Sequence, residues 1–248
     1  MDLMGKIIIG IIGGGFVGTA TRYLCENKKT KILVYDTSPE KSTVSSLEDL
    51  KNCELIFICV PTPMNPDGSC STCIVETTVK EINRICPVAK IILRSTVPPG
   101  TSEKLKVDFM PEFLTERNWK RDVERCDRWI LGLSPGTSDH SSILLQKILV
   151  EAHKESKITC KKIILETSKT AELTKYIANA FLATKISFFN EMGSICEHFE
   201  VPFENVRKLV TRDSRIGKSH SLVPGPDGKA GFGGVCLPKD ISGLNFKF

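Results

Sequence analysis

One cysteine near the end of the chain stands in a setting that favours nucleophilic chemistry. Cys236 follows a glycine-rich stretch (231–234) and precedes Pro238, a residue suited to the first turn of a helix. A thiol near a helix N-terminus has a lowered pKa and attacks electrophiles more readily. Asp240 would lie in the first turn of that helix, where a carboxylate is favoured. The alternative interpretation of Cys236 is a buried apolar thiol.

A second candidate group lies on a predicted long helix, residues 168–199. Lys175 and Asn179 are four residues apart and therefore share one face of that helix. On a face that lines a cleft, they could bind a developing oxyanion or a water molecule. They could equally belong to a solvated face on which Glu172 pairs with Lys175. The spacing leaves both interpretations open.

A glycine motif near the start of the chain predicts a dinucleotide site. Residues 13–18 read GGGFVG and follow an apolar run directly. Gly13 permits a tight turn, Gly15 lets the backbone approach a pyrophosphate, and Gly18 lets the next helix pack on the strand. Asp36 closes the second apolar run and can accept hydrogen bonds from ribose hydroxyls, whereas it would repel a 2′-phosphate. The pattern favours NAD over NADP.

The elements that must position these residues alternate between strands and helices. Apolar runs at 7–12, 31–35, 55–60, 90–93 and 129–133 are typical of buried parallel strands, and helical spacing covers 16–26, 74–85 and 139–150. This alternation predicts a doubly wound parallel α/β sheet of the Rossmann type. Thr62, Ser95 and Thr96 follow two of the strands, at the edge where such sheets bind ligands.

The 168–199 helix is expected to be covered on all sides. Its middle carries apolar residues around the whole circumference, among them Tyr176, Phe181 and Phe188. A helix with such a pattern is buried all round. A small helical domain could hardly cover it alone, so the sequence predicts a subunit interface.

Composition narrows the class of protein. The 248 residues include 34 basic and 29 acidic side chains, a net charge of +5 spread along the chain, which does not favour nucleic-acid binding. No apolar run reaches the roughly 20 residues of a membrane span. Ten cysteines without a disulfide framework indicate a reducing cytoplasm. The single CxxC at 70–73 and four scattered histidines predict no metal site.

Seven segments in order make the chain similar to the UDP-glucose/GDP-mannose 6-dehydrogenase family. They are GGGFVG (13–18), CVPTPMNPDGS (59–69), RSTVPPGT (94–101), MPEFLTE (110–116), ELTKYIANAFLATKISFFNE (172–191), RIGKSH (215–220) and GFGGVCLPKD (231–240). The resemblance implies an NAD-binding Rossmann domain over 1–165 and a helical central domain, like that of 6-phosphogluconate dehydrogenase, over 166–248. The central domain would form a homodimer. The family's usual C-terminal UDP-binding domain is expected to be absent from this chain.

The resemblance also implies a reaction and the residues that perform it. The C6 alcohol of UDP-glucose would be oxidised twice by NAD to give UDP-glucuronate, through a thiohemiacetal and a thioester on Cys236. The implied catalytic residues are Thr96, Glu112, Glu116, Lys175, Asn179, Cys236 and Asp240. The implied cofactor contacts are Gly13, Gly15, Phe16, Val17, Gly18, Asp36, Lys41, Thr62, Ser95, Thr96 and Glu116. The implied substrate contacts are Glu112, Phe113, Leu114, Lys175, Asn179, Arg215, Phe232, Gly233 and Cys236.

Three alternatives remain open at this point. The same chemistry could act on GDP-mannose or a UDP-N-acetyl sugar. The chain could be a truncated, non-catalytic module that binds NAD and dimerises. A β-hydroxyacid dehydrogenase shares the plan of a Rossmann domain followed by a long helix, but it would not need Cys236.

Overall fold

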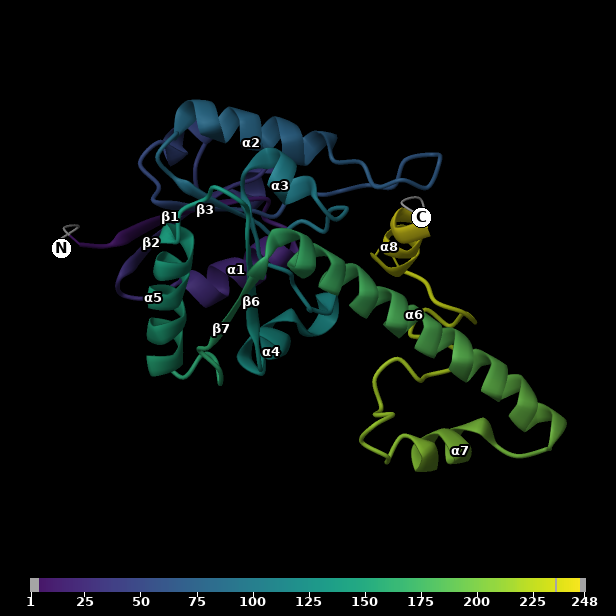
Figure 1. Ribbon diagram of the computed structural model, residues 1–248. Coiled ribbons are helices and arrows are strands. Elements are labelled where there is room, and N and C mark those ends of the chain that lie inside the picture. Colours follow the sequence, from purple (N-terminus) through teal and green to yellow (C-terminus); the bar gives the residue numbers. More distant parts are fainter. Residues whose placement is uncertain (1–4, 235, 246–248) are drawn as a thin grey trace. The chain divides into compact units, whose positions relative to one another are not determined.

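The computed structural model describes residues 5–234 and 236–245 (Figure 1). The chain forms two compact units, and each is described by itself. The first comprises Met1–Pro63 and Ser71–Lys175, and the second comprises Met64–Cys70 and Tyr176–Phe248. The units part inside the long helix, ten residues after the boundary at 165 that the sequence suggested, and a short segment of the first half belongs to the second unit.

The first unit is built on a seven-stranded sheet. Its strands are β1 (Ile7–Ile12), β2 (Thr30–Tyr35), β3 (Leu55–Ile58), β4 (Lys90–Leu93), β5 (Asp108–Phe109), β6 (Trp129–Leu133) and β7 (Ile163–Thr167). They lie side by side in the order β2-β1-β3-β4-β5-β6-β7. Neighbouring strands are parallel except at β5 and β6, which pair antiparallel. The predicted doubly wound α/β fold is confirmed, with a reversal at this one pair.

Helices cover both faces of this sheet (Figure 1). They are α1 (Phe16–Cys25), α2 (Cys73–Ile85), α3 (Thr101–Leu105), α4 (Trp119–Glu124) and α5 (His140–Lys154), with short 3-10 turns at Pro39–Lys41, Leu47–Leu50 and Glu116–Asn118. In β3, Leu55 and Phe57 pack into the core beneath α1 and α5, while Ile56 and Ile58 pack into the core beneath α2. Burial on both faces explains why these strands are continuous apolar runs.

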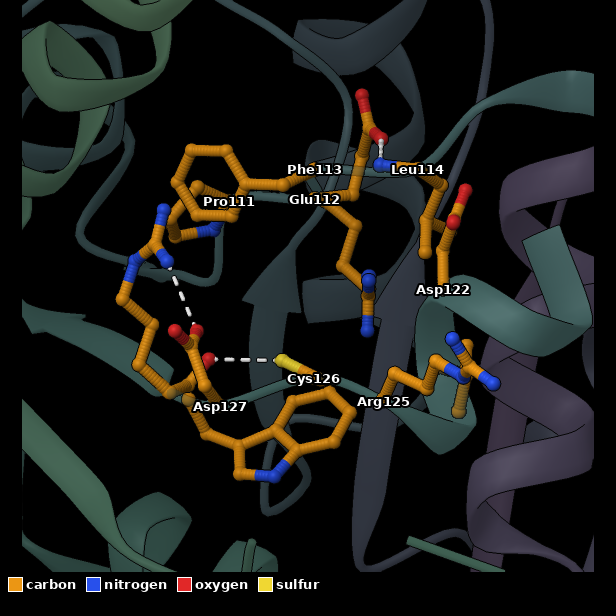
Figure 2. A pocket seen from close by; sticks show the side chains of 12 residues that line it. Pro111, Glu112, Phe113, Leu114, Asp122, Arg125, Cys126 and Asp127 are labelled. Carbon is orange, nitrogen blue, oxygen red and sulfur yellow. Dashed lines mark hydrogen bonds and ion pairs between the residues drawn. The ribbon is translucent and has the colours of Figure 1, made fainter. Parts of the chain in front are cut away.

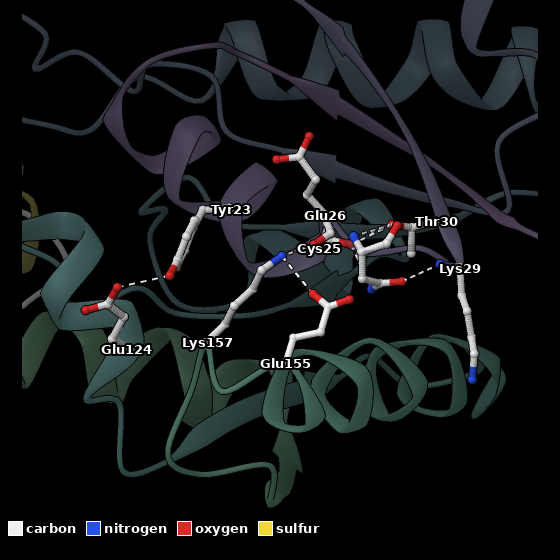
Figure 3. A network of polar contacts seen from close by, with 9 residues as sticks. Tyr23, Cys25, Glu26, Lys29, Thr30, Glu124, Glu155 and Lys157 are labelled. Atoms are coloured by element: carbon white, nitrogen blue, oxygen red, sulfur yellow. Dashed lines mark hydrogen bonds and ion pairs between the residues drawn. The ribbon is translucent and has the colours of Figure 1, made fainter.

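A polar network ties α1 to the segments that pack beside it (Figure 3). The hydroxyl of Tyr23 donates to Glu124 of α4 at 2.9 Å, and the ammonium of Lys157 donates to the carbonyl of Glu26. The Lys120 and Lys157 ammonium groups lie 5.2 and 5.7 Å from the Tyr23 ring centroid. These contacts fix α4, which follows the segment containing four expected site residues, 112, 113, 114 and 116.

The second unit is helical. It contains most of α6 (Ser168–His198), together with α7 (Phe203–Val210) and α8 (Cys236–Asn245). Within one copy of the chain, α6 is not covered on all sides. Tyr176 and Phe189 are buried, but Phe181 and Phe188 are 65% and 51% exposed. The all-round apolar pattern therefore combines a buried face with an open apolar face.

None of the helices in 5–234 and 236–245 is both long enough and apolar enough to cross a membrane. Over the same residues, no cluster of three or more His, Cys, Asp or Glu side chains could hold a metal ion.

Candidate active site

The glycine turn between β1 and α1 has the geometry that a bound dinucleotide requires. Gly13 has φ +98°, and a Cβ there would lie 2.5 Å from the carbonyl oxygen of Cys59. A Cβ at Gly18 would lie 1.8 Å from the carbonyl oxygen of Gly13. Both positions are restricted to glycine by close backbone approach, as a tight turn packed under a helix demands.

The N-terminus of α1 is open towards a ligand. Gly15 is its N-cap and supplies no side-chain cap, and the first turn holds no acidic residue. A Cβ at Gly15 would meet no atom within 4 Å, so space lies beside the backbone there. Uncapped amides at the positive end of a ten-residue helix bind phosphate groups well. The residues at 13–18 fit the pyrophosphate of NAD.

Asp36 lies next to this turn. Its carboxylate accepts the amide hydrogens of Gly14 at 2.6 Å and Ser38 at 2.8 Å. Burial alone would raise the pKa of Asp36, but these hydrogen bonds and the charge of Lys41 together hold it below its usual value. Lys41 lies close by, since a Cβ on Gly14 would lie 2.8 Å from the Lys41 Cβ. The structure thus brings together the two side chains expected at the adenosine ribose.

Hydroxyl groups join the loops that follow β3 and β4. Thr62 donates to the carbonyl of Thr96 at 2.8 Å, and Ser95 donates to the carbonyl of Val60 at 2.6 Å. Thr62 and Ser95 are buried. These contacts order both loops at the sheet edge where a doubly wound fold binds its cofactor.

Lys175 and Glu112 form a buried ion pair. Their Nζ and Oε1 atoms are 2.8 Å apart, and the side chains are only 6% and 7% exposed. The second carboxylate oxygen of Glu112 accepts the amide hydrogen of Leu114 at 2.8 Å. The ammonium lies 5.7 Å from the Phe113 ring centroid. A cation held in a dry setting can stabilise a developing oxyanion strongly.

Glu172 does not pair with Lys175, so the alternative of a solvated Glu172–Lys175 face is wrong. Its fully buried carboxylate accepts amide hydrogens from Gly100 at 2.5 Å and Ser102 at 2.8 Å. Burial raises the pKa of Glu172, although these hydrogen bonds favour the ionised form. Glu172 therefore anchors the loop that contains Ser95 and Thr96 to α6. Sequence reasoning missed this role because the two amides lie about 70 residues away.

In the second unit, Asp240 joins Asn179 and a lysine. Asn179 Nδ2 donates to Asp240 Oδ2 at 2.5 Å, and Lys239 Nζ lies 2.5 Å from Oδ1. Asp240 is 2% exposed. Cys236 is the first residue of α8 and is exposed, so the thiol lies at a helix start and the alternative of a buried thiol is wrong. The expectation that Asp240 lies in the first turn of this helix is also wrong, because the helix begins at Cys236 rather than at Pro238 and its first turn holds no acidic residue. Sequence reasoning missed Lys239, although it lies beside an expected catalytic aspartate.

The glycine-rich loop before α8 is attached to α6 by a polar side chain that the sequence reasoning also missed. Gly231 donates its amide hydrogen to Asn190 Oδ1 at 2.8 Å. Gly233 lies close to Asp227, since a Cβ on Gly233 would lie 3.0 Å from Asp227 Oδ2. Phe232 lies between these two glycines.

Arg215 projects from a turn fastened to α6. Its side chain is 88% exposed and forms a 2.6 Å ion pair with Asp213. The Lys185 ammonium donates to the carbonyls of Ile216 at 2.6 Å and Gly217 at 3.1 Å. Burial lowers the pKa of Lys185. Glu116 begins a 3-10 turn and is exposed, so the structure assigns it no contact with the other expected residues.

Two family models match the chain. Residues 41–150 match the NAD binding domain of the UDP-glucose/GDP-mannose dehydrogenase family, and residues 169–248 match the central domain of the same family. Together these segments cover well over half of the chain.

Individual relatives agree with the models. A UDP-glucose 6-dehydrogenase of Rickettsia felis is 35% identical over 99% of this chain and 60% of its own length. One of Pseudomonas aeruginosa is 34% identical over 82% of this chain and 46% of its own length. A solved UDP-glucose dehydrogenase of Pyrobaculum islandicum superposes with a TM-score of 0.81 and 26% identity, covering 100% of this chain and 65% of that one. The chain spans about half to two thirds of the length of these relatives.

Proposed function

The chain belongs to the UDP-glucose/GDP-mannose dehydrogenase family, and we propose that it catalyses the NAD-dependent oxidation of the C6 alcohol of UDP-glucose to the carboxylate of UDP-glucuronate. One observation carries the proposal: exposed Cys236 begins α8, while Asp240, one turn later, is buried against Asn179. A fixed helix thus presents a thiol at its positive end. An oxidation that needs only one hydride transfer would have no use for such a thiol.

The cofactor assignment rests on the first unit. The open amides of α1 suit a pyrophosphate, and Asp36 suits a free 2′-hydroxyl on the adenosine ribose. When bound, NAD supplies the hydride acceptor for each of the two oxidations. Thr62, Ser95 and Thr96 would line the nicotinamide half of the cleft, with Glu116 beside the reacting water.

In the first oxidation the alcohol loses its C6 hydride and its hydroxyl proton, and an aldehyde results. We assign stabilisation of the developing oxyanion to Lys175, which is positioned by its ion pair with Glu112. Asn179, bonded to Asp240, would donate a hydrogen bond to the same oxygen or hold a water molecule.

In the second oxidation the Cys236 sulfur bonds to the aldehyde carbon, and the carbonyl oxygen takes up a proton as the thiol loses one. The resulting thiohemiacetal loses a second hydride and its hydroxyl proton to give a thioester. Water then attacks the thioester carbon, the carbon–sulfur bond breaks, and the carboxylate and the free thiol are released. Covalent attachment retains the reactive aldehyde throughout.

Residues of each unit are proposed as sugar contacts. They are Glu112, Phe113 and Leu114 of the first unit, and Phe232 and Gly233 of the second. Arg215 would reach the sugar nucleotide of a neighbouring subunit. Its exposed position on an anchored turn agrees with that role.

A homodimer through α6 completes the proposal. Ile177, Phe181, Phe188 and Ile195 recur every four or seven residues, and each is between 47% and 65% exposed. This spacing places them on one stripe of the helix. Contact with the same stripe of a second copy would remove it from water.

Turnover with a panel of nucleotide sugars tests the substrate assignment. The purified chain is incubated with NAD and with UDP-glucose, GDP-mannose or a UDP-N-acetyl sugar, and NADH absorbance is followed. We expect UDP-glucose to give the highest kcat/KM, because the curated relatives cited above are UDP-glucose 6-dehydrogenases. Preference for another sugar would keep the chemistry and overturn the substrate. NAD binding without turnover on any sugar would favour a non-catalytic module.

A further inference from the structure

A buried arginine without a counter-charge lies in the first unit, and the proposed reaction does not use it. Arg94, directly after β4, is 3% exposed. Among the residues that the structure describes, its Nη1 lies 3.7 Å from the sulfur of Met110 and its Nε has no hydrogen-bond partner. Among residues 5–234 and 236–245, no carboxylate forms an ion pair with it. A buried, unpaired charge costs the folded state several kcal/mol.

The neighbouring thiols do not neutralise Arg94. Burial raises the pKa of Cys25 to about 12 and that of Cys59 to about 11, even though the Arg94 charge acts to lower both. The pKa of Cys126 is raised by burial in the same way. These thiols are therefore neutral at physiological pH and leave the guanidinium charge uncompensated.

Arg94 lines a pocket of about 210 Å³ (Figure 2). Pro111 and Phe113 lie on one side of it, and Asp122 and Arg125 lie on the other. The exposed side chains of Arg125 and Arg128 also line it, so the pocket reaches the surface. A water molecule occupies about 30 Å³ in the liquid, so this space holds a phosphate-sized ion with some waters.

The carboxylates of the pocket are already engaged. Glu112 pairs with Lys175, Asp127 pairs with Arg128 at 2.8 Å, and Asp122 accepts two hydrogen bonds from Thr115 at 2.7 Å. Arg94 and Arg125 are left without an acidic partner in the part of the chain that the structure describes. With Glu112 paired to Lys175 and Asp127 paired to Arg128, the charges left at the pocket are those of Arg94, Arg125 and Asp122, which sum to a net positive charge. A planar guanidinium recognises oxyanions through paired hydrogen bonds.

We propose that this pocket binds a small oxyanion of the size of phosphate, with Arg94 as the buried anchor and Arg125 at the rim. Glu112 and Phe113 line the same pocket, so an occupant would restrict the backbone of residues 111–114. The site is distinct from the α1 N-terminus, and it does not depend on the proposed dehydrogenase reaction.

The test compares thermal unfolding of the nucleotide-free chain in sodium phosphate and in sodium chloride at equal ionic strength. We expect phosphate to raise the Tm of the unaltered chain by a few degrees. Arg94→Met should abolish this rise. In chloride, Arg94→Met should be at least as stable as the unaltered chain, because an unpaired buried charge is removed and the shape is kept. Arg84→Met, on exposed α2 and paired with Glu48, should keep the full rise.

Three outcomes would overturn the proposal. If phosphate still stabilises Arg94→Met, the ion binds elsewhere, for example at the α1 N-terminus. If Arg94→Met is much less stable in both salts, the guanidinium is a structural group. If Arg94→Met fails to fold, the rise in Tm that phosphate causes is measured on Arg125→Ala instead. An unchanged rise contradicts the site, and a rise weakened several-fold supports it. Slower hydrogen exchange at 111–114 in phosphate would locate the ion in this pocket.

Discussion

Lys175 and Glu112 depend on each other because both are buried. At 2.8 Å and with 6% and 7% exposure, each neutralises a charge that would otherwise be isolated from water. Breaking such a buried pair is expected to cost more stability than breaking a surface ion pair, which contributes about 0–1 kcal/mol. In this structure the pair also positions the Lys175 ammonium for its proposed task at the oxyanion.

A double-mutant cycle measures this coupling. Lys175→Met or Glu112→Gln alone should lower the free energy of unfolding by about 3–5 kcal/mol, because each leaves one unpaired buried charge. The double variant should recover part of that loss. Denaturant unfolding provides the values, with the exposed pair Arg84 and Glu48 as the control cycle. Additive losses at 175 and 112 would show that the two charges are not coupled.

We expect Asp36 to determine which dinucleotide is accepted. Its pKa is held below the usual value, so its negative charge persists at mildly acidic pH. Asp36→Ser should weaken NAD binding by roughly tenfold or more, because hydrogen bonds to a charged group contribute about 1.5–3 kcal/mol. It should also reduce the discrimination against NADP. Titration calorimetry with both dinucleotides checks this, with Asp67→Ser on an exposed loop as control. An unchanged preference would remove Asp36 from the ribose site.

At the scale of elements, α6 links groups that are distant in sequence. Within the first unit its first two turns hold Glu172 against the loop before α3 and Lys175 against Glu112. Within the second unit its later turns hold Asn179 against Asp240 and Lys185 against the turn that contains Arg215. One uninterrupted helix therefore sets the register of four contacts.

Glu172→Ala tests the attachment of this helix to the cofactor loop. The amides of Gly100 and Ser102 would lose their acceptor, at a cost of about 1–3 kcal/mol for each group left unsatisfied. Glu103→Ala, which removes a partly exposed ion pair with Lys169, is the control and should cost much less.

The stability difference between the unaltered chain and Glu172→Ala should also depend on pH. The folded-state pKa of Glu172 is raised, so the native state holds this proton more tightly than the unfolded chain does. The stability contribution of Glu172 is therefore complete below the ordinary carboxyl pKa of about 4.3 and decreases as pH rises through the raised value. The stability difference between the unaltered chain and Glu172→Ala should shrink across that window. A difference that grows with pH would contradict the buried, destabilised carboxylate.

The sequence predicted the elements whose signals are local. The turn at 13–18, the buried strands and the long helix follow from glycine geometry and apolar spacing, and the structure confirms them. β5 was not predicted because two residues give no periodicity, and β7 because most of its residues are exposed. The Glu172–Lys175 expectation failed because spacing on one helix cannot reveal acceptors and amides about 70 residues away. The open face of α6 could not be predicted for a similar reason. The sequence shows how apolar a helix is, but it does not show which segments cover it.

At the scale of the whole molecule, the open stripe on α6 predicts self-association. Phe181→Glu introduces a charge at the centre of the stripe, where the aromatic ring is 65% exposed. The unaltered chain should elute as a dimer in size-exclusion chromatography with light scattering, and Phe181→Glu should be monomeric at the same concentration. Val88→Glu, at a 78% exposed apolar residue of the first unit, is the matched control and should remain dimeric. A monomeric unaltered chain would contradict the proposed interface.

NADH stoichiometry tests the central claim most directly, because only a two-step oxidation needs the thiol at the start of α8. A limiting amount of UDP-glucose is converted to completion with excess NAD, once by the unaltered chain and once by Cys236→Ala. We predict two NADH for each sugar consumed and no carboxylate product from the variant, with NAD binding unchanged in both. One NADH per sugar, or full activity of Cys236→Ala, would contradict covalent catalysis by this cysteine. NAD binding without any NADH from the unaltered chain would contradict its proposed activity altogether.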